Sequence, residues 1–126
     1  MVIEHGEVTI EVQDNIIIAR LVGAFNEYGA QQYTKGVKSI IENLQGESFS
    51  ILINNLQVQG GTPEAYQELE NYNLWLNQQK LIGKAMVITS SITLDVIDKL
   101  SPSRAKQKTK NFDNEKDAMN WLMSLN

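Results

Sequence analysis

The sequence predicts an α/β fold with a mixed, mostly parallel five-stranded sheet, an antiparallel N-terminal strand and helices on both faces. Two observations support this prediction: the chain begins with two adjacent strand-like segments, and helix-like segments then alternate with strand-like segments to its end. A hairpin followed by alternating units is typical of a parallel sheet with right-handed crossover connections. We therefore expect the order β-β-α-β-α-β-α-β-α in a single domain that covers residues 1–126.

The N-terminal hairpin supplies the antiparallel strand. Apolar and polar residues alternate over 6–13, which indicates a half-exposed strand at an edge of the sheet. Asp14 and Asn15 tolerate the positive φ of a two-residue hairpin turn. The β-branched run over 16–22 then predicts a strand that is buried on both faces.

A helix and a third strand follow the hairpin. The apolar period changes to that of a helix at Asn26, and Gly46 offers a stop. The apolar run over 49–56 predicts a strand, and the polar, glycine-containing stretch over 57–61 predicts a loop.

The second helix has a strong start signal. Thr62 is a favoured N-cap and Pro63 is favoured at the first helical position, so we expect a helix from there to about Gln79.

The second half of the chain repeats the alternation. We expect a strand over 84–90, a short helix over 93–100, a weak strand over 106–112 and a last helix capped by Asp113 or Asn114. In this arrangement we expect the second and third helices to cover one face of the sheet, and the first and fourth helices to cover the other.

Composition limits the chemistry that the chain can perform. Among 126 residues, 42% are hydrophobic and 21% charged, which suits a globular core. The chain has no cysteine and a single histidine, His5, so thiolate chemistry is excluded and a zinc site is poorly supplied. We expect no metal and no cofactor.

Charge and hydropathy predict the location. A formal net charge of −4 argues against sequence-independent binding of nucleic acid, which requires a positive field. The segment from Met1 to Val8 contains charged residues where a signal peptide would be apolar, and no later stretch approaches the length of a spanning helix. We expect a cytoplasmic protein, with peripheral association at the inner face of the membrane as an added prediction.

Three stretches of the chain resemble the bacterial SpoIIAA-like family. These are Ile16-Ile-Ile-Ala-Arg-Leu in the hairpin, Ile51-Leu-Ile-Asn-Asn-Leu in the third strand, and the ending Asn111-Phe-Asp-Asn-Glu-Lys-Asp-Ala-Met-Asn-Trp-Leu. The order of elements resembles that family over nearly the whole chain. The resemblance implies a SpoIIAA-like fold, which STAS domains and the lipid-carrying part of CRAL-TRIO proteins share.

The family implies two different functions. Its anti-sigma-factor antagonists have an Asp-Ser-Ser-Gly-like stretch after the third strand, in which phosphorylation of a serine breaks a partner interaction. Here that stretch reads Gln59-Gly-Gly-Thr-Pro-Glu, so only Thr62 lies near the phosphorylated position, and the Asp and the second Ser are missing. The similarity to CRAL-TRIO proteins implies instead a carrier of nonpolar molecules, with a cavity beneath movable helices.

The second and third helices contain the candidate ligand-binding residues. Their apolar side chains cover a wider arc than packing on a sheet requires. One interpretation is that they cover the edges of the core; the other is that they line or gate an apolar cavity, or form a face for a membrane or a second subunit. The residues are Tyr66, Leu69, Tyr72, Leu74, Trp75, Leu76, Val96, Ile97 and Leu100.

A basic segment follows these helices. Between residues 99 and 110 there is no acidic residue, and the segment could orient the chain on anionic headgroups, bind an acidic protein or a phosphate, or be a solvated loop. Its members are Lys99, Arg104, Lys106, Lys108 and Lys110.

No catalytic motif is present. The sequence has no Gly-x-Ser-x-Gly nucleophile elbow, and the glycines at 60 and 61 lack Walker or dinucleotide spacing. Glu64, Glu68 and Glu70 are expected on the solvated side of the second helix.

The functional prediction is a non-enzymatic binder or carrier of a nonpolar, lipid-like ligand that associates reversibly with anionic membranes through the second and third helices. The alternative is a regulatory protein-interaction module that resembles the anti-sigma-factor antagonists and recruits its partner near Thr62. A homodimer is compatible with either function, and an interfacially activated enzyme is the least favoured.

Overall fold

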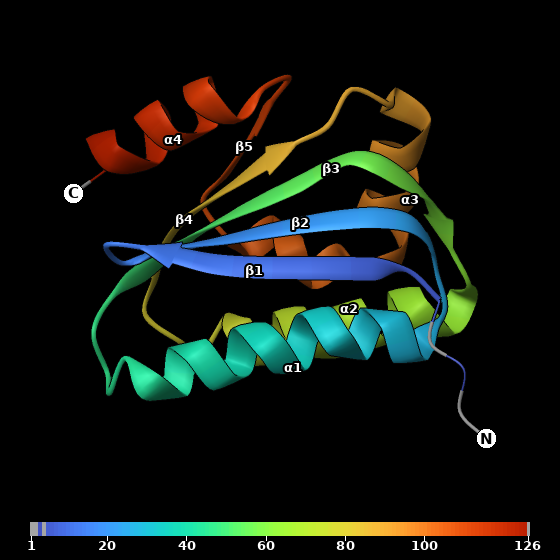
Figure 1. Ribbon diagram of the computed structural model, residues 1–126, viewed down its shortest axis with the longest axis horizontal. Coiled ribbons are helices and arrows are strands. Elements are labelled where there is room, and N and C mark those ends of the chain that lie inside the picture. The colour runs from blue at the N-terminus through green and yellow to red at the C-terminus, as the bar shows by residue number, and fades with distance from the viewer. Residues whose placement is uncertain (1–2, 4, 126) are drawn as a thin grey trace.

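The computed structural model describes residues 3 and 5–125; Met1, Val2 and Glu4 of the predicted N-terminal segment lie outside the described residues. One five-stranded sheet with the strand order β1-β2-β3-β4-β5 forms the centre of the molecule (Figure 1). The elements in chain order are β1 Glu7–Gln13, β2 Ile16–Phe25, α1 Glu27–Asn43, β3 Phe49–Gly61, α2 Pro63–Leu76, β4 Leu81–Val87, α3 Ser91–Leu100, the 3₁₀ helix η1 Pro102–Lys106, β5 Thr109–Phe112 and α4 Glu115–Ser124.

The predicted fold class is confirmed. β1 pairs antiparallel with β2, and all other neighbouring strands are parallel. At the hairpin turn, Asp14 has a φ of +52°, whereas Asn15 has no positive φ. Asn114 caps α4 by accepting a hydrogen bond from the backbone N–H of Asp117, which decides between the two predicted caps.

The predicted distribution of the first helix was wrong. α1, α2 and α3 all cover one face of the sheet, and α4 alone covers the other. The strand order never reverses, so each parallel connection steps in the same direction across the sheet. Right-handed crossovers that all step in one direction place their helices on the same face. α4 follows the last strand, so no crossover constrains it and it is free to cover the opposite face.

The predicted boundaries of β3 and β5 also needed correction. The stretch over 57–61 is not a loop but the end of β3, where Val22 pairs with Gln57 and Phe25 pairs with Gly61. The backbone N–H and C=O groups of this polar stretch form hydrogen bonds with the long strand β2, and this pairing does not depend on the side chains. β5 begins at Thr109, because Lys106 belongs to η1.

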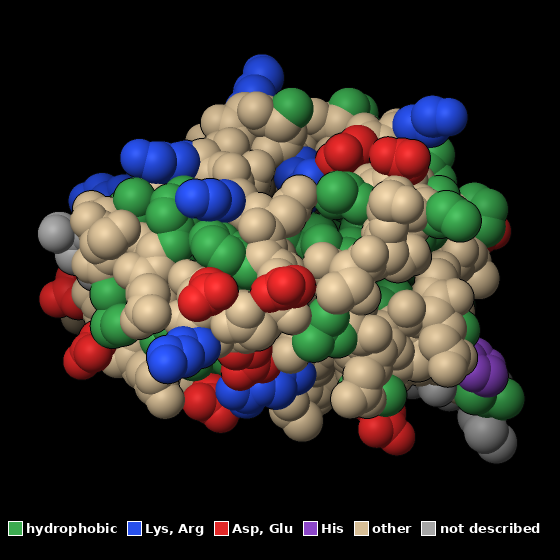
Figure 2. All heavy atoms as spheres, turned by 90° about the horizontal axis from the view of Figure 1, so that it is seen from above, with side chains coloured by type: hydrophobic (Ala, Val, Ile, Leu, Met, Phe, Trp, Pro, Cys, Tyr) green, Lys and Arg blue, Asp and Glu red, His purple; other side chains and the backbone are tan. Residues whose placement is uncertain are grey.

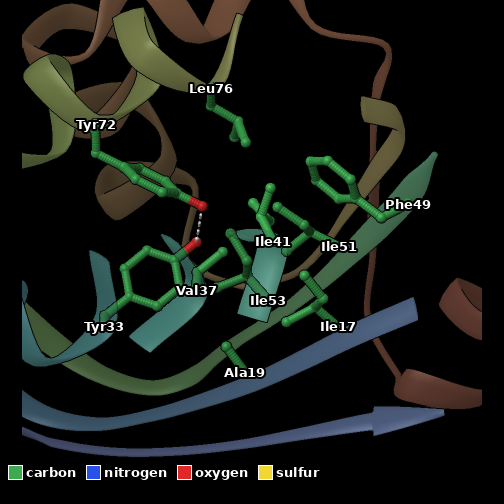
Figure 3. Close-up of a cluster of buried hydrophobic side chains, with 10 residues drawn as sticks. All are labelled: Ile17, Ala19, Tyr33, Val37, Ile41, Phe49, Ile51, Ile53, Tyr72 and Leu76. Atoms are coloured by element: carbon green, nitrogen blue, oxygen red, sulfur yellow. Dashed lines mark hydrogen bonds between the residues drawn. The ribbon is translucent and has the colours of Figure 1, made fainter. Parts of the chain in front are cut away.

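A large apolar cluster joins α1 and α2 to the sheet (Figure 3). Figure 3 shows Tyr33 of α1 and Tyr72 of α2 pointing toward each other, with their hydroxyl oxygens 3.4 Å apart. Phe49 lies on the opposite side of the drawn cluster. Tyr72 and Leu76 of α2 are both fully buried here. α2 is therefore firmly anchored to α1 and to the sheet.

α4 is held to the opposite face by packing and by an ion pair. Ala118 and Leu122 are fully buried against β2, β3 and β4. Arg20 of β2 donates two hydrogen bonds to the Glu115 carboxylate, at 2.8 and 2.9 Å, and Asn54 donates a third at 2.7 Å. The hydrogen bonds from Arg20 hold the pKa of Glu115 below its usual range.

Candidate functional site

The N-termini of three helices lie at one end of the sheet. α1, α2 and α3 each begin directly after a parallel strand, and their N-caps are Asn26, Thr62 and Ser90. Each cap accepts a hydrogen bond from a backbone N–H three residues on. Because the carboxyl ends of parallel strands meet at one edge, these three caps lie at the same end of the molecule, the usual location of binding sites in α/β sheets (Figure 1).

A cavity of about 70 Å³ extends inward from this end. Gly60, Gly61 and Thr93, where β3 meets α2 and where α3 begins, form its outer part. Its walls come from the sheet, α1, α2, α3 and η1, and are mostly apolar. Large apolar side chains that line it include Phe25, Tyr33, Tyr66, Leu69, Tyr72 and Ile97.

Lys84 is the first polar group of this cavity. It lies on β4 and is only 3% exposed. Its Nζ donates to Asn73 Oδ1 at 3.1 Å and to Gln107 Oε1 at 3.2 Å, and it lies 5.8 Å from the centroid of the Tyr72 ring. Both oxygen partners are neutral amides, so no carboxylate compensates the ammonium charge directly.

Arg104 is the second cationic group of the cavity and comes from η1. It is 7% exposed, and its Nη1 donates to Asp98, whose side chain is 56% exposed. Arg104 Nε and the Oγ of Ser101 are buried and have no hydrogen-bond partner among the described residues. Buried polar groups without partners are costly, so these atoms are available for a ligand.

Burial changes the ionisation of both cations. Desolvation, with a smaller contribution from the nearby charge of Arg104, lowers the pKa of Lys84 to about 7. Desolvation also lowers the pKa of Arg104, and Asp98 partly offsets this effect. The cavity therefore contains one permanent cation and one ammonium whose charge changes near neutral pH.

Hydrogen bonds fasten η1 and the residue that follows it, Gln107, to the C-terminal half of α2. The carboxylate of Glu70 accepts from the backbone N–H and the hydroxyl of Ser103. Asn77 donates to the Ser103 carbonyl oxygen at 2.9 Å, and Gln107 donates to both Asn73 and Asn77 at 3.0 Å. Glu70 is thus a tether between two elements, not the solvated surface carboxylate that the sequence predicted.

The predicted ligand-binding residues fall into two groups. Four of them line the cavity: Tyr66, Leu69, Tyr72 and Ile97. The other five do not. Leu74 and Leu100 are exposed, Leu76 is buried in the core, Val96 packs beside Ile97, and Trp75 packs beside the core.

Trp75 faces inward. Its ring stacks on Tyr72, with centroids 6.5 Å apart, and Lys38 Nζ of α1 lies 5.2 Å from its centroid. The apolar residues of α2 therefore do not form one continuous outer face. Membrane association through α2 and α3 stays a prediction. Among the residues that the structure describes, no helix is both long enough and apolar enough to cross a bilayer.

The residues of the basic segment also fall into two groups, exposed side chains and one that lines the cavity. Lys99, Lys106, Lys108 and Lys110 are exposed, but Arg104 points into the cavity and is not part of a surface patch. On the face shown in Figure 2, the Lys and Arg side chains are separated by hydrophobic, acidic and other atoms. Within the described part of the chain, no three His, Asp or Glu side chains are placed to hold a metal ion.

Sequence reasoning missed Lys84, Asn73 and Ser101, and it named Arg104 only as a member of the basic segment, not as a cavity residue. Lys84 gave a usable signal, because it is the single charged residue in a short apolar strand. Arg104 gave none, since it lies among other cations and only η1, which was not predicted, turns it inward.

No protein-family model matches the sequence, and no curated protein matches it. Solved structures do match. An uncharacterised protein of the DUF3478 family from Shewanella loihica PV-4, with a SpoIIAA-like fold, superposes with a TM-score of 0.70 at 16% identity, over 97% of both chains.

Two further matches are anti-sigma factor antagonists. The one from Mycobacterium paratuberculosis has a TM-score of 0.64 at 11% identity, over 94% of both chains. The antagonist SpoIIAA in its unphosphorylated form has a TM-score of 0.65 at 13% identity, over 93% of this chain and 98% of that chain. The chain therefore has the SpoIIAA-like α/β fold, which is also the fold of anti-sigma factor antagonists.

Proposed function

We propose that this chain is a regulatory protein-interaction module that binds an anti-sigma factor through the end of the sheet at which Thr62 lies. The observation that supports the proposal is the similarity in fold to two anti-sigma factor antagonists along more than nine-tenths of this chain. By their name, these proteins act on anti-sigma factors.

The surface around Thr62 suits such a partner. Thr62 is exposed at the start of α2, and Ile92 at the start of α3 is 77% exposed. A partner that covers this end of the sheet would remove the Ile92 side chain from water, and burial of an apolar side chain of this size contributes favourably to binding.

Thr62 is also the position at which modification would regulate binding. Its Oγ1 accepts a hydrogen bond from the Ala65 N–H at 3.1 Å, so a phosphate here would lie at the positive end of α2. A phosphate on Thr62 adds negative charge and bulk at the centre of the proposed interface, and we expect it to weaken partner binding.

The test is to titrate the anti-sigma factors of the organism that makes this chain into the purified protein, by calorimetry. We expect one of them to bind, and Thr62→Asp to weaken that binding at least about tenfold, which corresponds to about 1.4 kcal/mol. Aspartate is a good N-cap, so α2 keeps its start. Asn120→Asp adds the same charge to α4 on the other face and should leave binding unchanged. If none of these factors binds, the proposal is wrong.

A second function is supported by the cavity: binding of a small nonpolar ligand between α2, α3 and the sheet. The cavity is enclosed mainly by aromatic and aliphatic side chains, as ligand sites usually are. α3 has only one buried residue, Ile97, fewer than any other α-helix of the fold, so it is the α-helix best able to move and admit a ligand.

Two variants of the same helix test this second function. Leu69→Asp places a charge in the cavity wall, and we expect it to abolish the binding of short-chain alcohols followed by NMR. Leu74→Asp places the same charge on the exposed side of α2 and should leave binding intact, because Leu74 is 52% exposed. Equal binding by folded Leu69→Asp would contradict ligand entry into this cavity.

A further inference from the structure

The charged side chains that line the cavity are cationic. Among the described residues, its lining contains two cationic side chains, Lys84 and Arg104, and no Asp or Glu. Asp98 is the one carboxylate in the described part of the chain that pairs with either cation; it is not part of the lining and is more than half exposed. Two positive charges buried near each other are unfavourable, and a negative charge placed between them would offset both the desolvation and the repulsion.

The same groups have free hydrogen-bonding capacity. Arg104 Nε and Ser101 Oγ are buried without a partner among the described residues, and Ser101 is only 1% exposed. The Lys84 ammonium has three donors, and two of them are used by Asn73 and Gln107. Cationic donors favour an anionic acceptor, and a guanidinium favours a planar carboxylate.

The apolar part of the lining indicates the chemical character of the rest of the ligand. Next to the cationic groups lie Tyr66, Leu69, Met86 and Ile97, which offer no charge and little hydrogen-bonding capacity. The volume of about 70 Å³ has room for roughly five to seven water-sized groups, since one water needs about 10–15 Å³ on the same measure. This room suits a short hydrocarbon chain and is too small for a long acyl chain.

We propose that this cavity binds a small organic monoanion, a monocarboxylate with a short aliphatic chain, whose carboxylate lies against Lys84, Ser101 and Arg104. The inference builds on the cavity-binding function proposed above and adds the charge of the ligand. The ligand enters where Gly61 and Thr93 meet the surface, with its carboxylate foremost, and its chain then lies against Tyr66 and Ile97.

The experiment compares hexanoate with hexan-1-ol, a neutral compound with a chain of the same length, and with inorganic phosphate. Binding to the whole chain is measured by calorimetry and by amide chemical shifts. We expect hexanoate to bind with a Kd on the order of 1 mM or tighter, at least about tenfold tighter than hexan-1-ol, and phosphate to bind more weakly than hexanoate. We expect hexanoate to change the amide chemical shifts of residues 60–66, 84–86 and 97–104.

Two variants locate the anion. Lys84→Met keeps the length of the side chain and removes the charge, and it should reduce the affinity for hexanoate at least about tenfold while leaving that for hexan-1-ol unchanged. Lys99→Met removes an exposed cation of the basic segment and should change neither. Proton uptake provides a second test on the wild-type chain. At pH 8, we expect Lys84 to take up a proton when hexanoate binds. Calorimetry detects this uptake because the measured binding heat then depends on the ionisation enthalpy of the buffer.

Each other outcome overturns a defined part of the account. Equal affinities for hexanoate and hexan-1-ol would refute the anion site but leave nonpolar ligand binding standing. Binding of neither compound would refute both. Equal weakening by Lys84→Met and Lys99→Met would assign the effect to general surface charge and would also refute the site.

Discussion

Replacing Lys84 with methionine is expected to remove a rise in stability that the wild-type chain shows between about pH 7 and pH 10. The folded state holds the pKa of Lys84 at about 7, whereas a lysine in the unfolded chain has a pKa of about 10.4. Between these values the unfolded chain binds a proton that the folded chain does not. Stability therefore increases with pH, with a slope of up to about 1.4 kcal/mol per pH unit.

Below pH 7, Lys84 is charged in both states, and the cost of burying the charge is at its full value. Lys84→Met avoids this cost, so the variant should be more stable than the wild type at pH 6, by an amount that shrinks as the pH rises. Urea unfolding at pH 6, 7.5 and 9 measures the difference in unfolding free energy between the variant and the wild type. Contributions from groups that titrate in both proteins cancel in this difference. Lys80→Met, at an exposed lysine, is the control. Parallel stability curves for Lys84→Met and the wild type would show that Lys84 is not charged and buried as described.

Replacing Phe49 with alanine is expected to give the largest loss of stability among single truncations outside the cavity. Phe49 begins β3, is 1% exposed and packs in the cluster between α1, α2 and the sheet (Figure 3). Removing a fully buried aromatic ring costs about 3–5 kcal/mol, a large share of the roughly 5–15 kcal/mol that stabilises an ordinary domain.

Leu74→Ala is the control for this truncation, because Leu74 is 52% exposed and a surface change of this kind should alter the unfolding free energy by less than about 0.5 kcal/mol. Urea denaturation followed by circular dichroism measures both variants. A loss below about 1 kcal/mol for Phe49→Ala would mean that the cluster is packed differently.

Local signals in the sequence predicted the fold because they agree with one another. Thr62 and Pro63 mark the start of α2 through chemistry that does not depend on the rest of the molecule. The end of β3 was missed for the opposite reason. Its polar and glycine residues look like a loop, and only the backbone pairing with the end of β2 makes them a strand. Long-range pairing of this kind leaves no mark in local composition.

The candidate cavity was predictable only in its apolar half. Helical spacing predicted Leu69 and Tyr72 on one face of α2, with Tyr66 at its flank, and all three line the cavity. The cationic half depends on where β4 and η1 lie relative to α2. Arg104 illustrates the difficulty: as one cation in a basic segment it is typically solvated, and a single turn of 3₁₀ helix changes its surroundings completely.

The most direct test of the proposed regulatory function is an NMR map of the interface, recorded on the isotope-labelled chain as an anti-sigma factor from the same organism is added. We expect the amide signals of residues 56–66 and 90–93 to shift or broaden, while those of α4 stay unchanged. Changes confined to α4, or no changes with any such factor, would contradict the proposal that this end of the sheet is where the chain meets its partner.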